Sequence, residues 1–180
     1  MANVVLRAME PEDLDLLYQI ENDTKLWNIG LTNVPYSRYV LHDYIATSSG
    51  DIYTDKQVRL IIENEEHQTI GLVDIMNFNP QNRRAEMGIV VQEAFRQKGY
   101  GKDAIQKVMK YAKEVLHLHQ LYVVVNSSQK PTIGLFLCMG FKETCQLTDW
   151  LYDGEVYHDA TLLQCCLSSE NKQSNIFNCL

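Results

Sequence analysis

The residues whose types and spacing most clearly indicate chemistry are two glycines among three positive charges, in the run Arg96-Gln97-Lys98-Gly99-Tyr100-Gly101-Lys102. The run lies directly before a pattern typical of an amphipathic helix. Glycines let a backbone turn present several N–H groups on one side, and the positive end of the helix dipole adds to them. The sequence therefore predicts a turn that binds phosphate oxygens. The alternative is a tight structural turn whose charged side chains are only solvated.

Spacing separates this turn from two other phosphate-binding turns. A Walker loop needs Ser or Thr after Gly-Lys, but Asp103 follows Lys102. A dinucleotide-binding fingerprint needs a third glycine, and residue 104 is Ala. The remaining interpretation is a pyrophosphate-binding turn without a hydroxyl ligand for a metal ion.

Composition restricts the class of protein. A chain of 180 residues, of which 46% are hydrophobic, is expected to form one α/β domain. It has no apolar run long enough to span a bilayer, and its first residues do not resemble a signal peptide, so we expect a cytoplasmic protein with no membrane partner. The net charge of −7 argues against a nucleic-acid partner and is compatible with a cationic one, such as an amine or a basic peptide.

The five cysteines do not form a metal-binding pattern. They are odd in number and lack CxxC spacing, at positions 138, 145, 165, 166 and 179. Reduced thiols inside apolar segments are therefore expected rather than a disulfide framework, and no metal site is predicted.

Hydrophobic periodicity predicts a mixed order of strands and helices. Strands are expected over residues 3–9, 58–64, 69–78, 85–91, 121–125, 143–152 and 156–167, and helices over 10–23, 35–50, 102–116 and 130–139. A polar turn at 64–68 and the pair Asp153-Gly154 are typical of hairpins, and Gly140 is the expected end of the last helix. Residues 168–180 form a polar tail.

Helical spacing also predicts which side chains face the core. The expected apolar faces are Leu14, Leu17, Tyr18 and Glu21 in the first helix, Tyr39, Val40, Asp43 and Tyr44 in the second, and Ile105, Val108, Met109, Ala112, Val115 and Leu116 in the third.

The run from Arg83 to Phe141 resembles the Gcn5-related N-acetyltransferase (GNAT) family over its acetyl-CoA-binding region. Residues 96–101 match the family's phosphate signature, and the flanking elements match in order over about residues 4 to 167. The spermidine and ribosomal-protein N-terminal acetyltransferases of this family share Arg83-Arg84-Ala85-Glu86 and Gly140-Phe141. The resemblance implies an α/β (α+β) fold: one domain over residues 1–167, with a mixed, mostly antiparallel sheet flanked by helices. It also implies a V-shaped splay between the fourth and fifth strands.

The same resemblance implies where acetyl-CoA binds. The pantetheine would pair with the backbone of Ile89, Val90 and Val91, and the pyrophosphate would lie on the amides of residues 96–102. The cofactor-binding residues expected in this way are Ile89, Val90, Val91, Arg96, Gln97, Lys98, Gly99, Tyr100, Gly101, Lys102 and Asn126.

Glu86 is the expected catalytic base, or the residue that holds the cationic substrate. It lies on the opposite strand face from Ala85 and Met87 and is expected just before a bulge in the cofactor strand. The alternative is a surface ion pair with Arg83 or Arg84. The other expected substrate-binding residues are Glu21, Asn22, Trp27 and Trp150, with Asp23, Asp149 and Tyr152 as further possibilities. Their alternatives are an exposed helix end for the first group and plain core for Trp150.

The chain departs from the family pattern in the last helix. The relatives carry an Asn early in this helix and a proton-donating Tyr further along, where this chain has Gln129 and Phe136. Three functions stay open: acetylation of a polyamine or similar small amine, protein N-terminal acetylation, and acyl-CoA binding with little catalysis. A homo-oligomer is also compatible with the resemblance.

Overall fold

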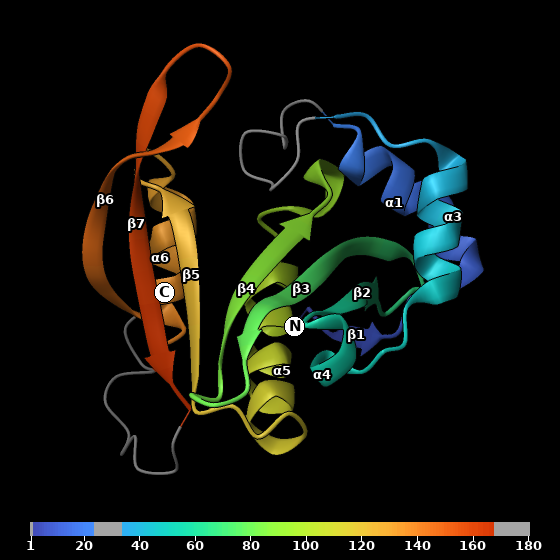
Figure 1. Cartoon of the computed structure of the whole chain (residues 1–180), viewed down its shortest axis with the longest axis horizontal. Helices are drawn as coiled ribbons and strands as arrows, with labels where there is room; N and C mark the ends of the chain where they lie inside the picture. The colour runs from blue at the N-terminus through green and yellow to red at the C-terminus, as the bar shows by residue number, and fades with distance from the viewer. Residues whose placement is uncertain (1, 24–33, 168–180) are drawn as a thin grey trace.

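The computed structural model describes residues 2–23 and 34–167. Its centre is one seven-stranded sheet with the strand order β1-β2-β3-β4-β5-β7-β6, and helices pack against this sheet (Figure 1). All neighbouring strands are antiparallel except β4 and β5, which run parallel. The mixed, mostly antiparallel sheet predicted from the sequence is therefore confirmed.

The strands lie close to their predicted positions: β1 (Val4–Arg7), β2 (Val58–Asn64), β3 (Thr69–Asn79), β4 (Arg84–Val91), β5 (Gln120–Asn126), β6 (Lys142–Tyr152) and β7 (Tyr157–Cys166). The helices are α1 (Leu14–Glu21), α3 (Arg38–Thr47), α4 (Ile52–Asp55), α5 (Tyr100–Glu114) and α6 (Lys130–Cys138), with short 3-10 turns η1 (Pro11–Asp13) and η2 (Glu93–Phe95). Among the described elements, α4 and η2 were not predicted. Helix α4 is a single turn capped by Asp51, and η2 contains three residues, so both are too short to produce a hydrophobic period.

Helices cover both faces of the sheet (Figure 1). The larger core lies between α5, α6 and the inward residues of β3, β4, β5 and β7. A smaller core joins α1 and α3 to the opposite face of β2, β3 and β4. Strand alternation assigns each side chain to one face: Ala85 and Met87 lie in the larger core, whereas Val90 packs against the smaller one.

Two predicted helix faces were partly wrong. In α3, Tyr39 and Val40 are exposed and Leu41 is the buried residue. In α5, Val115 lies at the helix end and is exposed, while Ala104 joins the buried stripe. The error in α3 is a shift of about one residue in helix phase, whereas in α5 the helix ends at Glu114, before Val115. In α1, which starts after η1, the buried residues are Leu16, Leu17 and Ile20.

Two loop and cysteine expectations also need correction. The β6–β7 turn contains the four residues 153–156 rather than Asp153-Gly154 alone, because Tyr152 pairs with Tyr157. Cys145, Cys165 and Cys166 are free thiols, but only Cys165 is buried, and Cys138 is disulfide-bonded rather than reduced. The predicted tail, residues 168–180, lies outside the described residues. In the described ranges no helix is both long and apolar enough to cross a membrane.

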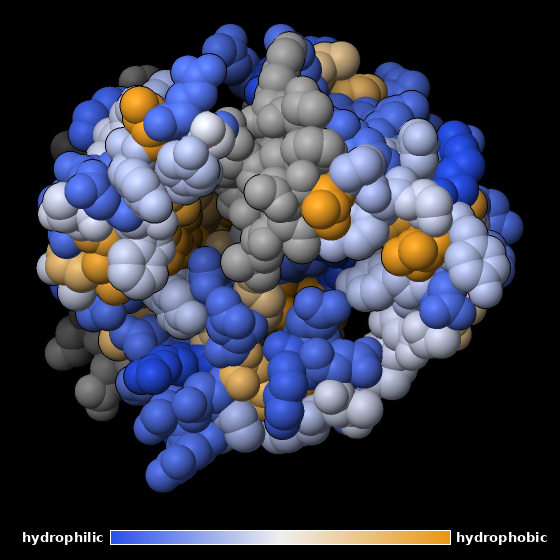
Figure 2. Space-filling view, turned by 45° about the horizontal axis from the view of Figure 1, so that its top comes forward, coloured by the Kyte–Doolittle hydropathy of each residue, from blue (hydrophilic) through white to orange (hydrophobic). Residues whose placement is uncertain are grey.

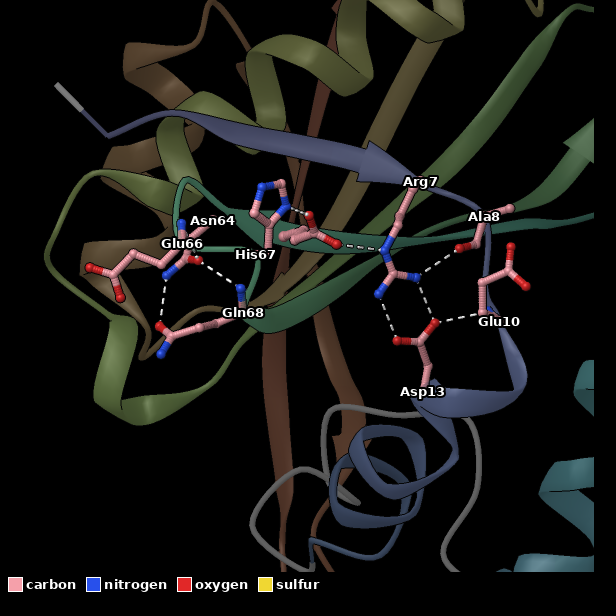
Figure 3. A network of polar contacts seen from close by, with 9 residues as sticks. Arg7, Ala8, Glu10, Asp13, Asn64, Glu66, His67 and Gln68 are labelled. Carbon is pink, nitrogen blue, oxygen red and sulfur yellow. Dashed lines mark hydrogen bonds and ion pairs between the residues drawn. The ribbon is translucent and has the colours of Figure 1, made fainter.

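An ion-pair network ties the start of the chain to the sheet (Figure 3). The Arg7 guanidinium donates hydrogen bonds to Asp13 at 2.7 and 2.8 Å and to Glu63 on β2 at 2.8 Å. Asp13 is 3% exposed, and it also accepts a hydrogen bond from the Glu10 N–H. Burial acts to raise the pKa of Asp13, but the hydrogen bonds from Arg7 and Glu10 outweigh it and lower that pKa. The network therefore holds the turn before α1 against β1 and β2.

Candidate active site

The central feature of the site is the divergence of β4 and β5. Only Arg84, Ala85 and Glu86 pair with β5, opposite Gln120, Leu121 and Tyr122. Beyond these pairs β4 stays bonded to β3, and β5 stays bonded to β7. Among the described residues, both strands thus keep an inner edge without a strand partner, which is the predicted V-shaped splay (Figure 1). Figure 2 looks toward the open side of the V and shows hydrophobic residues in a hollow bordered by hydrophilic ones.

The turn between β4 and α5 presents unpaired backbone N–H groups. Within the described part of the chain, the N–H groups of residues 97–102 donate no hydrogen bond, and the first N–H with a partner is that of Asp103, to Gly99. Gln97 and Gly99 have left-handed backbone conformations, with φ of 60° and 89°. Alternating backbone handedness next to a helix N-terminus forms an anion-binding concavity. The geometry fits the predicted pyrophosphate site.

One glycine of this turn has a different role from the predicted one. Gly101 lies inside α5 and does not have a positive φ. A Cβ at this position would lie 3.6 Å from Leu135 of α6, which is ordinary contact. Gly99 alone therefore needs the conformational freedom of glycine here.

The side chains of Arg96, Lys98 and Tyr100 contact other residues of the same turn or of η2 and β4, so they do not form one outward-facing cationic group. The Arg96 Nε donates a hydrogen bond to the Val91 carbonyl at 2.8 Å, and the Lys98 Nζ lies 5.4 Å from the centre of the Phe95 ring. The Tyr100 ring also packs near Phe95, with 6.4 Å between centroids. Lys102 is exposed. The predicted phosphate contacts are consequently contacts of the backbone first, with exposed lysines beside it.

The remaining predicted cofactor residues flank the V. Ile89 and Val91 pack toward α5, and their strand has a free edge on the β5 side. Asn126 ends β5, where its side-chain oxygen accepts hydrogen bonds from the N–H and hydroxyl of Ser128, at 2.9 and 2.7 Å. Asn126 thereby shapes the turn that leads to α6.

Glu86 lies at the vertex of the V, in the last residue pair before the strands diverge. Its half-buried carboxylate accepts a hydrogen bond from the Asn77 side chain at 2.7 Å. In the described ranges it makes no ion pair with Arg83 or Arg84, so the alternative role as a surface ion pair is not observed. The predicted bulge in β4 is also absent, because β4 keeps one register with β3 from Glu86 to Val91. The irregularity lies in β3, between Met76 and Asn79.

Two neighbours of Glu86 were not identified from the sequence. Tyr122 on β5 is its strand partner, and Asn77 on β3 donates the hydrogen bond to its carboxylate. Burial and the negative charge of Glu86 raise the pKa of Tyr122. The alternation in 121–125 does place Tyr122 on the opposite face from Leu121 and Val123, but nothing local in the sequence indicates which residue it meets.

A cluster of three charged side chains lies on the same sheet face, which α1 and α3 cover. Arg59 of β2 donates to Asp74 of β3 at 2.6 and 2.9 Å and to Glu21 of α1 at 2.5 Å. The Arg59 side chain is 16% exposed. Burial acts to lower the pKa of Arg59, but the two carboxylates outweigh it and raise that pKa. Glu21 was expected at the acceptor site, whereas Arg59 and Asp74 were not identified.

The other predicted acceptor residues are spread over the molecule. The Asn22 side chain bonds to the backbone of Tyr18 and Tyr36, so it joins the end of α1 to the segment before α3. Trp27 lies outside the described residues. Trp150 lies on edge strand β6, separated from β4 by β5 and β7, and is 59% exposed, so it is not a core residue. Its role in substrate binding stays a prediction.

Phe136, at the position of the family tyrosine, belongs to the larger core. It is 2% exposed and packs edge-on against Phe141, with 5.2 Å between ring centroids. Gln129 precedes α6 as its N-terminal cap residue. Neither residue supplies a hydroxyl proton donor.

The family assignment follows from comparison with known proteins. A family model described as "Acetyltransferase (GNAT) domain" matches residues 3–142. The chain belongs to the GNAT acetyltransferase family. This GNAT protein is an N-acetyltransferase with acetyl-CoA as its acetyl donor.

The relatives and solved structures that resemble this GNAT enzyme include spermidine acetyltransferases. The spermidine N(1)-acetyltransferase of Escherichia coli (strain K12) is 27% identical over 159 residues, covering 88% of this chain and 83% of the relative. The spermidine N-acetyltransferase of Vibrio cholerae in complex with CoA and spermine gives a TM-score of 0.81 at 23% identity, covering 92% of this chain and 96% of that one. A dodecameric structure of the Vibrio cholerae enzyme gives a TM-score of 0.78 at 24% identity, covering 96% and 99%.

Proposed function

We propose that this GNAT enzyme transfers the acetyl group to a primary amine of a polyamine or a similar small amine. The observation that carries the proposal is the position of Glu86, a half-buried carboxylate at the vertex of the V formed by β4 and β5. The names of the spermidine acetyltransferases that resemble the chain support the choice of amine.

Bound acetyl-CoA supplies the acetyl group as a thioester. In the proposal, the N–H groups of residues 97–102 bind its pyrophosphate, because they lack other partners in the described structure and lie at the positive end of α5. The free inner edge of β4, from Ile89 to Val91, orients the pantetheine by backbone hydrogen bonds. These contacts direct the thioester toward the vertex, where Glu86 lies.

Glu86 then accepts the proton of the attacking amine, directly or through one water. An amine attacks a thioester only as the neutral base, so a carboxylate beside it removes the proton that would block attack. The hydrogen bond from Asn77 holds the carboxylate on the α1 and α3 face of the sheet. The acceptor therefore approaches from that face, opposite the larger core.

Charge on the acceptor face supports a cationic substrate. Arg59 provides one positive charge against the carboxylates of Glu21 and Asp74, and Glu86 adds a further negative charge at the vertex. A polyamine complements this excess of carboxylates and retains positive charge after one of its amines has lost a proton. Protein N-terminal acetylation remains the alternative, and it differs in needing a peptide backbone at the acceptor side.

The Glu86→Gln variant tests the proposal, because it keeps the shape and removes the charge. We expect acetyl transfer to spermidine to fall by about a hundred-fold or more, with unchanged acetyl-CoA affinity. Glu114→Gln, on an exposed residue of α5, serves as the matched control and should retain full activity. Full activity of Glu86→Gln would contradict the base assignment, and faster acetylation of N-terminal peptides than of any polyamine would favour the alternative substrate.

The proposal includes a cytoplasmic location and self-association. The exposed aromatic side chains of the β6–β7 arm, Trp150, Tyr152 and Tyr157, supply apolar surface for contacts between copies. The particle mass in solution, measured by light scattering, tests the self-association, and a monomer at all concentrations would contradict it.

A further inference from the structure

We propose that Met76 is a specificity-determining residue, whose side chain forms the apolar surface for the methylene segment next to the reacting amine. The inference rests on the proposed function and deepens it, because it concerns the shape of the acceptor that meets Glu86. The surface selects unbranched aliphatic amines over amines that carry a substituent on the carbon beside the nitrogen. Most peptide N-termini belong to the second class, because their amine is attached to a branched carbon.

Strand register places Met76 directly beside Glu86, on the sheet face that α1 and α3 cover. The two residues are partners in the antiparallel pairing of β3 and β4, and Asp74 is the partner of Gly88 in the same register. Ile75 lies in the larger core, so strand alternation directs the side chains of Asp74 and Met76 to the opposite face. The pair of Met76 with Glu86 and the pair of Asp74 with Gly88 are therefore consecutive on the acceptor face.

The Met76 side chain extends across β4 and lies over Gly88. A Cβ built at Gly88 would lie 3.0 Å from the Met76 Cε and 3.9 Å from the Asp74 Cβ. Because Gly88 does not have a positive φ, its close contact with Met76 is the feature that suits glycine here. Met76 is half-buried, so part of its side chain is accessible to a ligand on this face.

Negatively charged groups flank this apolar surface on two sides. Glu86 is the strand partner of Met76, and Asp74 lies two residues before Met76 on β3. Asp74 is bound to Arg59, which also binds Glu21, so two carboxylates share one guanidinium. A linear polyamine has the complementary pattern, because its ammonium groups alternate with short methylene segments. Burial of such a segment against a flexible thioether stabilises the complex.

A substituent on the carbon beside the amine would meet the Met76 methyl group. The nitrogen must lie close to the Glu86 carboxylate for proton transfer, directly or through one water, so the carbon attached to it lies near the neighbouring thioether. An unbranched carbon presents only hydrogen atoms to Met76, whereas a branch adds a methyl-sized group in space that the side chain fills. One such group in an apolar site changes kcat/KM by about ten-fold or more.

The test compares kcat/KM for spermidine with kcat/KM for spermidine methylated on both carbons that carry its primary amines, at saturating acetyl-CoA. The wild type should prefer spermidine by about ten-fold or more. In Met76→Ala the space is open and the apolar contact is lost, so this preference should nearly disappear while acetyl-CoA affinity stays unchanged. Met109→Ala is the matched control: Met109 is a half-buried methionine of α5 that packs against the larger core, so its removal should lower stability and leave the preference in place.

Gly88→Ala provides a second variant, which acts on Met76 from the neighbouring strand. Its Cβ displaces the mobile end of the Met76 side chain rather than backbone, so the fold is kept, and kcat/KM for spermidine should fall by about ten-fold. In the Met76→Ala background the same change should have little effect, because no methyl group is displaced. A wild-type preference in Met76→Ala, or equal effects of Gly88→Ala in both backgrounds, would overturn the inference. Full activity of Glu86→Gln would instead contradict the proposed function, so the two failures are distinguishable.

Discussion

The two sides of the V are built in different ways. On the cofactor side, the groups offered to a ligand are backbone N–H groups of residues 97–102 and the free edge of β4, while side chains such as Arg96 support the turn. On the acceptor side, the groups that face a ligand are side chains from α1, β2, β3 and β4, and these side chains are hydrogen-bonded to one another. In the proposed function, backbone groups bind acetyl-CoA, which is the same donor for every acceptor, whereas the side chains face the amine and can vary with it.

This difference predicts that the cofactor side depends on backbone conformation more than on any side chain. Gly99→Val should reduce acetyl-CoA affinity about a hundred-fold or more, because a β-branched residue does not accept a φ of 89° and its Cβ would lie 3.4 Å from Ala2. Isothermal titration calorimetry on the folded variant measures the effect.

Gly154→Val is the control for backbone strain alone. Gly154 has a φ of 101° in the β6–β7 turn, and a Cβ there meets no atom within 4 Å. This variant should lose stability but keep its acetyl-CoA affinity. Equal affinity of Gly99→Val and the wild type would show that the turn does not hold the pyrophosphate.

Breaking the Arg7–Asp13–Glu63 network should affect the acceptor side and not the cofactor side. Asp13→Asn leaves the Arg7 guanidinium without its buried carboxylate, and we expect the free energy of unfolding to fall by about 2 to 3 kcal/mol at neutral pH. Because Asp13 precedes α1, the KM for spermidine should rise while acetyl-CoA affinity stays unchanged. Urea unfolding and steady-state kinetics measure the two effects.

The pH dependence of this loss has a defined sign. The pKa of Asp13 is lower in the folded protein than the unfolded value of about 3.9, so its contribution is present above that value and decreases as the pH falls below it. The stability difference between the wild type and Asp13→Asn should therefore shrink below about pH 4. A difference that stayed constant down to pH 2 would contradict the network.

The cofactor side was predicted from the sequence more completely than the acceptor side, because its features lie within short segments of the chain. Two features follow from local sequence patterns: the turn at 96–102, and the position of Glu86 on the strand face opposite Ala85 and Met87. The structure has both features at the predicted residues. The helix start at Tyr100 nevertheless put Gly101 inside α5, because the boundary of a helix depends on capping geometry.

The missed residues come from contacts between distant segments. Arg59 meets Glu21 over 38 residues of chain, and Asn77 reaches Glu86 only because β3 breaks its register. Register and bulges depend on packing between strands, which periodicity in a single segment does not report. The substrate-binding roles of Asn22, Trp27 and Trp150 consequently stay predictions.

The most direct test of the account is hydrogen exchange of the backbone amides of residues 97–102, measured with and without acetyl-CoA. These N–H groups have no acceptor within the described structure, so they should exchange fast in the free enzyme and become strongly protected when the pyrophosphate binds. The amides of α3 should change little. Binding of acetyl-CoA without protection at residues 97–102 would contradict the central claim that this turn holds the cofactor.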